Sequence, residues 1–295
     1  MPTLAVAISC LASMAAAQDA AARRSPTLHG PASAIDSEHM FGFTKGTDIG
    51  DRGELEAEVE SEAGIGKRAG SYAAALLMLE LKYTPVQDFR VAPSLAFAAH
   101  RIAGVPGMAD VRQVDVEGFG VELKHRVWNR ARAPVGLTVS IDPHWSQIDA
   151  GSGERGQHYG LAALVALDKE LVPNRVFGAF NALYDPRWSR PAGAGAWHGD
   201  AVVGVAAALT RQAWPGVFIG GEARYLRAYE GLALRALAGD AVFAGPTLYV
   251  MLSEHWNMTF AWNAQIFGHA AGDPRALDLV NFERHQIMLR FGARL

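Results

Sequence analysis

The stretch GELEAEVESEAGIG, residues 53–66, decides between helix and strand because it carries a glutamate at every second position from Glu54 to Glu62. Glu, Ala and Leu are good helix formers, but two helical steps turn about 200°, which would scatter the carboxylates around the helix. In a strand, alternate residues share one face. The sequence therefore predicts a strand with one apolar and one acidic face, and the acidic face needs water or cationic partners.

The same alternation returns along the whole chain and predicts twelve strands. Residues 76–83 (LLMLELKY), 119–128 (FGVELKHRVW) and 135–145 (VGLTVSIDPHW) are clear examples. Breaks after the even-numbered strands are tight, whereas those after the odd-numbered strands are longer, except for a short first break at KRAG. Short turns at one end, longer loops at the other and an even strand number are typical of an antiparallel, up-and-down transmembrane β-barrel of about 12 strands.

A soluble sandwich or propeller would also alternate and is the competing interpretation. The position of the aromatic residues favours the membrane, where Trp and Tyr form a belt at each interface. Beside tight turns lie Tyr83, Trp128, Trp214 and Trp256, and beside longer loops lie Trp145, Tyr159, Tyr184, Trp188, Trp197 and Tyr225.

The last stretch, HQIMLRFGARL (residues 285–295), resembles the closing strand of Gram-negative outer-membrane β-barrel proteins. Apolar residues alternate there from Ile287 to Leu295, although the family usually ends in Phe. The resemblance implies an outer-membrane location, surrounding outer-membrane lipid, periplasmic short turns, extracellular longer loops, and a barrel-assembly machinery that reads the C-terminal strand. It specifies the class and no individual member.

The region before the barrel divides into two parts. Residues 1–17 are uncharged and end in Ala15-Ala16-Ala17, which predicts an export signal cleaved before Gln18, although no Lys or Arg lies near Met1. A buried helix or a lipobox at Cys10 are the alternatives. Residues 18–52 are expected to be a periplasmic lead-in or a plug, with 41–51 (FGFTKGTDIGD) as the plug candidate, and residues 53–295 form the barrel domain.

The acidic face of the first strand must turn to the lumen, because lipid does not tolerate Glu. Barrel closure places the last strand antiparallel to the first, so we expect Arg294 near Glu54, Arg290 near Glu58, and Lys82 at the same end. Small inward residues on strands near 158–167 and 200–210 are expected to stand opposite the charged side chains of Glu122, Lys124, Arg126, Glu222 and Arg224. The predicted lumen-lining charge ladder comprises Glu54, Glu56, Glu58, Glu60, Glu62, Lys82, Arg90, Glu122, Lys124, Arg126, Glu222, Arg224, Arg290 and Arg294.

The sequence indicates no enzyme, metal or cofactor. The ten histidines are scattered, Gly-x-Ser-x-Gly is absent, and the outward His125 and His285 lack an outward Ser partner for lipid hydrolysis, which stays the less favoured alternative. Neighbouring Glu pairs would attract a divalent cation only if no Lys or Arg stood beside them. A net charge of −3 without a basic run argues against nucleic acid.

Two functions remain open at this stage. The first is a narrow channel or passive transporter for small solutes, with selectivity set by a mixed-charge lumen. The alternative is a structural or binding barrel whose lumen is filled and whose extracellular loops carry the function.

Overall fold

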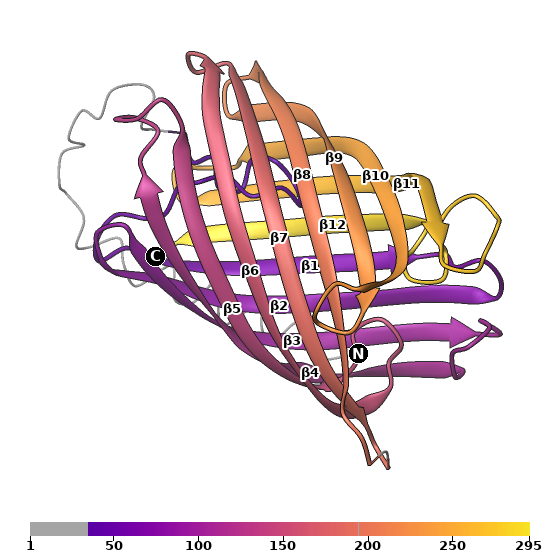
Figure 1. Ribbon diagram of the computed structural model, residues 1–295. Coiled ribbons are helices and arrows are strands. Elements are labelled where there is room, and N and C mark those ends of the chain that lie inside the picture. Colours follow the sequence, from indigo (N-terminus) through magenta and orange to yellow (C-terminus); the bar gives the residue numbers. More distant parts are fainter. Residues whose placement is uncertain (1–34, 194) are drawn as a thin grey trace.

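The computed structural model describes residues 35–193 and 195–295, which form one closed antiparallel barrel of twelve strands in sequential order (Figure 1). The predicted all-β, up-and-down barrel is confirmed. The predicted export signal and the lipobox lie outside the described residues. The strands are β1 (Leu55–Ile65), β2 (Ser71–Val86), β3 (Phe89–Ala103), β4 (Val111–Trp128), β5 (Gly136–Ile148), β6 (Arg155–Val172), β7 (Val176–Pro191), β8 (His198–Trp214), β9 (Val217–Glu230), β10 (Ala236–Met251), β11 (Trp256–Ala270) and β12 (His285–Arg294).

Several strands extend beyond the stretches of alternating hydrophobicity from which they are predicted. β4 begins at Val111 and β6 continues to Val172, so the connection between β3 and β4 shrinks to residues 104–110. The hydrogen-bonded ladder between two strands does not require an apolar face once it leaves the membrane. Strand pairing therefore continues past the point where hydrophobic alternation fades.

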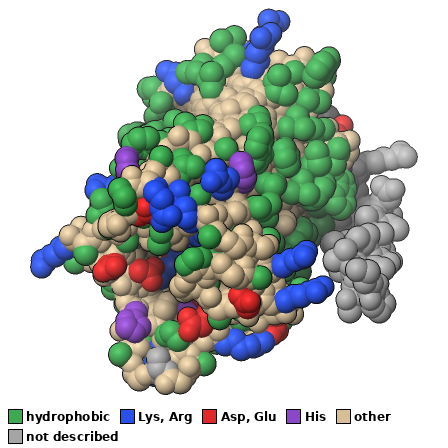
Figure 2. Space-filling model, turned by 90° about the vertical axis from the view of Figure 1, so that its right-hand side faces the viewer, with side chains coloured by type: hydrophobic (Ala, Val, Ile, Leu, Met, Phe, Trp, Pro, Cys, Tyr) green, Lys and Arg blue, Asp and Glu red, His purple; other side chains and the backbone are tan. Residues whose placement is uncertain are grey.

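The outer surface is a hydrophobic band that ends in aromatic side chains. Leu79, Leu81 and Phe119 are exposed on it, and Trp128 and Trp214 are exposed beside the tight turns. This is the pattern expected of a surface that faces lipid. Figure 2 looks onto the end with the longer loops, where Lys, Arg, Asp, Glu and His side chains gather, with hydrophobic side chains along the flank. Among the described residues, no helix is long and apolar enough to cross a membrane.

Residues 35–52, called the inner segment below, lie inside the barrel at the end of the tight turns. Met40 and Phe41 are completely buried and pack against Phe177 of β7, Phe218 of β9 and Tyr249 of β10. Two edge-to-face aromatic pairs, with ring centroids 6.0 Å apart, join the last three rings. An apolar contact thus anchors a segment that is otherwise surrounded by polar side chains.

A glycine allows the inner segment to turn beneath this contact. Gly42 has φ +82°, and a Cβ atom there would lie 2.7 Å from a Glu222 oxygen and 2.8 Å from the Ala261 side chain. We predict that Gly42→Ala loosens the inner segment while the barrel stays folded, measured as faster hydrogen exchange of the amides at 40–46.

Gly53 offers a matched control for this substitution. Its φ is +86°, but a Cβ atom added there would have no neighbouring atom within 4 Å. Gly53→Ala carries only the backbone penalty, roughly 1–2 kcal/mol, so it should perturb exchange less than Gly42→Ala. Equal effects of the two substitutions would show that the tight packing around Gly42 is not important.

Candidate functional site

The acidic face of β1 points into the lumen over its whole length. The side chains of Glu56, Glu58 and Glu60 are buried, whereas Glu62 is exposed to an open part of the lumen. Glu54 precedes the strand and is half-buried. Strand alternation accounts for this arrangement, because Leu55, Ala57 and the following odd-numbered residues take the lipid side.

Cations from both neighbouring strands contact these carboxylates. Arg290 of β12 places Nε 3.3 Å from Glu58 Oε1 and Nη2 2.5 Å from Glu60 Oε2. Arg294 places Nε 3.2 Å from Glu54 Oε1, and Lys82 of β2 places Nζ 2.5 Å from Glu58 Oε2. The backbone register pairs Arg290 with Glu60 and Arg294 with Glu56, two residues from the expected pairing, and the long side chains reach back across this offset.

A second wall of the lumen is basic. Arg90 of β3 and Lys124 of β4 are buried, and both contact Glu38 of the inner segment. Arg90 binds both Glu38 oxygens at 2.5 Å, a bidentate arrangement, and Lys124 Nζ lies 2.8 Å from Oε1. Arg90 also donates to Glu122 at 2.7 Å. The burial of Glu38 alone would raise its pKa, but these cations outweigh burial and hold the pKa well below its usual range.

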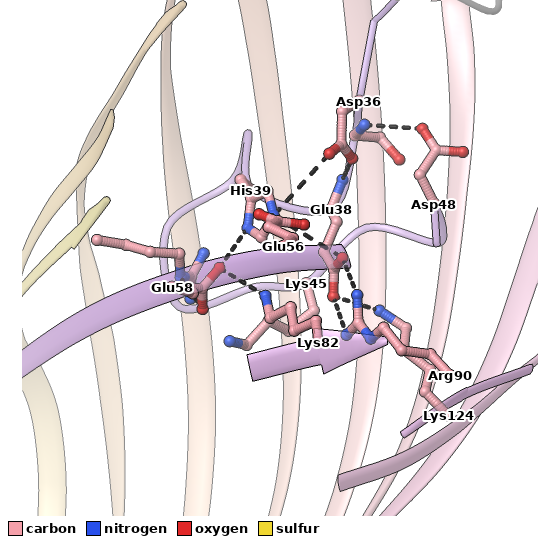
Figure 3. Close-up of polar contacts among 12 residues, drawn as sticks. Asp36, Glu38, His39, Lys45, Asp48, Glu56, Glu58, Lys82, Arg90 and Lys124 are labelled. Atoms are coloured by element: carbon pink, nitrogen blue, oxygen red, sulfur yellow. Dashed lines mark hydrogen bonds and ion pairs between the residues drawn. The ribbon is translucent and has the colours of Figure 1, made fainter. Parts of the chain in front are cut away.

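The next residue of the inner segment faces the acidic wall. His39 lies with Nε2 3.1 Å from Glu56 Oε1 and Nδ1 3.1 Å from Glu58 Oε2 (Figure 3). Burial lowers the pKa of His39, but the two carboxylates raise it more, and the net pKa lies above its ordinary value. Glu38 and His39 are therefore adjacent residues of opposite charge, each placed against the wall of opposite sign.

His39, Glu56 and Glu58 also form a group whose ligand atoms lie within 4.8 Å of one another, as a metal site requires. The two ring nitrogens face different carboxylates, and Glu58 already accepts from Lys82. The geometry fits a protonated imidazolium between two carboxylates better than it fits a metal centre.

On the side of the inner segment that faces β9, a side chain of this strand binds backbone amides of the segment. Glu222 accepts from the Phe43 and Thr44 amides at 3.1 and 2.8 Å. The Arg224 guanidinium lies 3.8 Å from the centroid of the Phe43 ring and donates to Gln286. The expectation that these charges stand opposite β8 is wrong, because β9 is the neighbour of β8 in the barrel.

The remaining predicted cation lies away from this network. Arg126 is buried near the tight turn between β2 and β3 and pairs with Asp88 of that turn at 2.6 Å. It faces the lumen side of the wall but contacts no carboxylate of β1 among the contacts found in the described chain.

Sequence reasoning missed one further cluster. Arg130 follows β4 and places Nη1 2.6 Å from Asp48 of the inner segment and 3.1 Å from Asp168 of β6. Asp168 accepts from Thr47 Oγ1 at 2.6 Å. Glu38, His39 and Asp48 carry no strand periodicity, so only their unusual density of charge within a short non-strand segment signals a role.

Beyond the inner segment the lumen opens into a cavity of about 420 Å³. Phe43 and Lys45 form part of its floor, and it extends to Asp149 and Ala150 in the loop after β5. On the other side, Phe282 of the loop between β11 and β12 folds inward against Phe243. Among the described residues, the cavity lining carries two Lys or Arg side chains, Lys45 and Arg187, and eight carboxylates: Glu60, Glu62, Glu80, Glu117, Glu122, Asp142, Asp149 and Asp185. Three of these carboxylates also lie within 4 Å of cations outside the lining, Glu60 of Arg290, Glu80 of Lys82 and Glu122 of Arg90.

Residues 33–295 match the model of a family described as a family of unknown function (DUF6662). The chain belongs to this family. No curated protein matches the sequence significantly.

Two solved structures have a fold similar to that of this chain at low sequence identity. The COG4313 outer membrane channel from Pseudomonas putida F1 is 11% identical, with a TM-score of 0.57, and the match covers 84% of this chain and 98% of the channel. The translocator domain of the autotransporter NalP from Neisseria meningitidis is 12% identical, with a TM-score of 0.51 and coverages of 82% and 87%. The DUF6662 chain therefore has the fold of Gram-negative outer-membrane β-barrel proteins.

We predict that Glu38→Gln weakens the docking of the inner segment. The substitution leaves the buried Arg90 and Lys124 without their shared carboxylate, a loss of about 3–5 kcal/mol when a buried pair is broken. Amide exchange at residues 36–50 should accelerate by orders of magnitude. Asp51→Asn is the control, since Asp51 is exposed in the same segment and loses the same charge. Equal exchange in both variants would contradict the assigned contact.

The docking of the inner segment should also depend on pH through His39. Its pKa is raised in the folded state, so its stabilisation is complete below the unfolded value of about 6.5 and is lost as pH rises through the folded pKa. Amide exchange at residues 36–50 should therefore accelerate above neutral pH by more than the pH-dependent increase in the exchange rate of unprotected amides. His39→Gln should remove this extra dependence, and His255→Gln, at an exposed turn position, should retain it.

Proposed function

We propose that this protein is a narrow outer-membrane channel for small solutes that favours cations, and that residues 35–52 close its periplasmic half. The acidic cavity carries the proposal. It lies between the longer loops and the inner segment, and its lining carries eight carboxylates and two Lys or Arg side chains. Glu62, Glu117, Asp142 and Asp149 have no Lys or Arg partner among the ion pairs of the described residues, so the lining keeps an excess of negative charge. A low-dielectric wall lined by one sign of charge concentrates ions of the opposite sign.

Ala162 and Leu164 of β6 form a small apolar part of the cavity wall. The space beside Gly160 and Gly204 is taken by the side chains of His144 and Leu226. The volume of about 420 Å³ falls in the range of small-molecule sites. A solute that enters from outside would meet Glu62 before it reaches Lys45, which contacts Glu60, and Glu80 lies one inward position further toward the tight turns, at the level of Glu58.

The inner segment is the barrier in this proposal. It is held by ion pairs and side-chain hydrogen bonds rather than by strand pairing, and local stabilities of this kind are lower than that of a barrel. Displacement of Glu38 and His39 would leave Arg90 of β3 and Lys124 of β4 on the same side of the lumen as the acidic β1, separated from it by β2. Solutes would then pass along a wall with an acidic and a basic stripe.

A structural or binding barrel is the second candidate, and the dense network around Glu38, His39 and Asp48 favours it. A lumen filled and neutralised in this way needs no path. The proposed C-terminal recognition by an assembly machinery applies equally to both candidates.

Planar bilayer recordings separate the two candidates. We expect wild-type protein to be mostly closed, and Glu38→Gln/Asp48→Asn to produce defined openings with a preference for K⁺ over Cl⁻. Glu62→Gln/Glu80→Gln in that background should reduce the cation preference several-fold. Glu254→Gln, in an exposed tight turn, should leave it unchanged. A released variant with a folded barrel and no conductance above leak would refute the channel and support the filled barrel.

A further inference from the structure

A shallow groove of about 480 Å³ crosses the outer, lipid-facing surface of β1 to β4. Its base is a row of register partners in which Ala63, Ala75 and Ala99 are followed by Val114. The next row toward the tight turns is larger, with Leu77 beside Phe97. The alanines therefore form a depression in an otherwise bulky hydrophobic surface.

The groove ends in two arginines at its extracellular edge. Arg101 of β3 and Arg112 of β4 are direct register partners, and both side chains are exposed. Two like charges directly opposite each other destabilise a sheet. Within the part of the chain that the structure describes, neither guanidinium has an ion-pair partner, so both are available to an external anion, which would relieve their mutual repulsion.

The height of the groove places it at the outer leaflet. Leu55 pairs with Tyr83 at the tight-turn end of the barrel, and Ile65 pairs with Ala73 at the other end of β1. Ten strand steps at ~3.3 Å, tilted by ~40°, rise about 25 Å, the height of the apolar band of such barrels. The alanine row thus crosses β1 near the upper edge of the hydrocarbon, and Arg101 and Arg112 lie two residues further from the tight turns than Ala99 and Val114, on the head-group side of the row.

We propose that this groove binds a phosphorylated acyl lipid of the outer leaflet. One acyl chain occupies the depression over Ala63, Ala75 and Ala99, and Arg101 and Arg112 bind the phosphate as a charge-assisted pair. Apolar burial and anion recognition lie at the matching depths for such a lipid. The site lies on the opposite face of the wall from the lumen, so it does not depend on the channel proposal.

Native mass spectrometry of the full-length barrel in detergent tests the site with bis-phosphorylated lipid A as the probe. We expect wild-type protein to retain one tightly bound lipid. Arg101→Gln/Arg112→Gln should lower its affinity by about ten- to thirty-fold, given the typical contribution of each cation near a membrane surface. Ala75→Leu/Ala99→Leu should lower retention by filling the groove while both arginines remain.

Two controls keep the test specific. Arg132→Gln/Arg235→Gln removes the same charge at exposed positions away from the groove and should leave lipid A retention unchanged. All variants are compared only as folded barrels, which an unaltered circular dichroism spectrum shows. Phosphatidylcholine should be retained weakly. Unchanged lipid A retention in both groove variants, equal retention of phosphatidylcholine, or a wild-type dimer that Ala75→Leu/Ala99→Leu dissociates would overturn the proposal. The last outcome would assign the groove to a second copy of the chain.

Discussion

The structure depends on one constraint, which is that the four glutamates of β1, with Glu54 just before it, have nowhere to go except the lumen. Hydrocarbon excludes them, and an unpaired charge buried in the lumen would be nearly as costly. Three cations from β2 and β12 neutralise part of the β1 face. The inner segment adds His39 beside Glu56 and Glu58 and Lys45 beside Glu60, whereas Glu62 faces the open lumen. The residues that neutralise β1 therefore also occupy the lumen at the end of the tight turns.

The inner segment adds a cation and an anion at adjacent positions. Glu38 contacts Arg90 and Lys124, while His39 contacts Glu56 and Glu58. A neutral segment of the same length would leave both walls uncompensated, whereas a segment of one sign would satisfy one wall and repel the other. The charge pattern of the lumen therefore accounts for the place of the segment, and its apolar contact through Phe41 fixes the depth.

Much of the barrel follows from the sequence because alternation reports directly on which face of a strand meets lipid. The twelve strands and the inward position of Glu56 and Arg290 could be predicted in this way. The register between β1 and β12 could not be fixed to better than two residues, since no turn joins these strands and the stagger of the whole closed barrel sets their pairing. The contacts of Glu38, His39 and Asp48 could not be predicted at all, because a segment without regular structure leaves no periodic signal and its partners are distant in sequence.

An engineered disulfide between the inner segment and the wall tests most directly whether this segment closes the barrel. A Cβ atom at Gly136 would lie 3.0 Å from Thr47 Cβ and 2.3 Å from Asp168 Oδ1. The two backbones therefore need to separate by about 0.5 Å to reach the ~3.5–4.5 Å Cβ spacing of a disulfide, and the Asp168 carboxylate needs to turn aside. In Thr47→Cys/Gly136→Cys combined with Glu38→Gln/Asp48→Asn, we predict that the cross-link forms, that the oxidised protein is silent in bilayers, and that reduction restores the openings. Conductance that is the same before and after reduction, with the cross-link formed, would contradict the account.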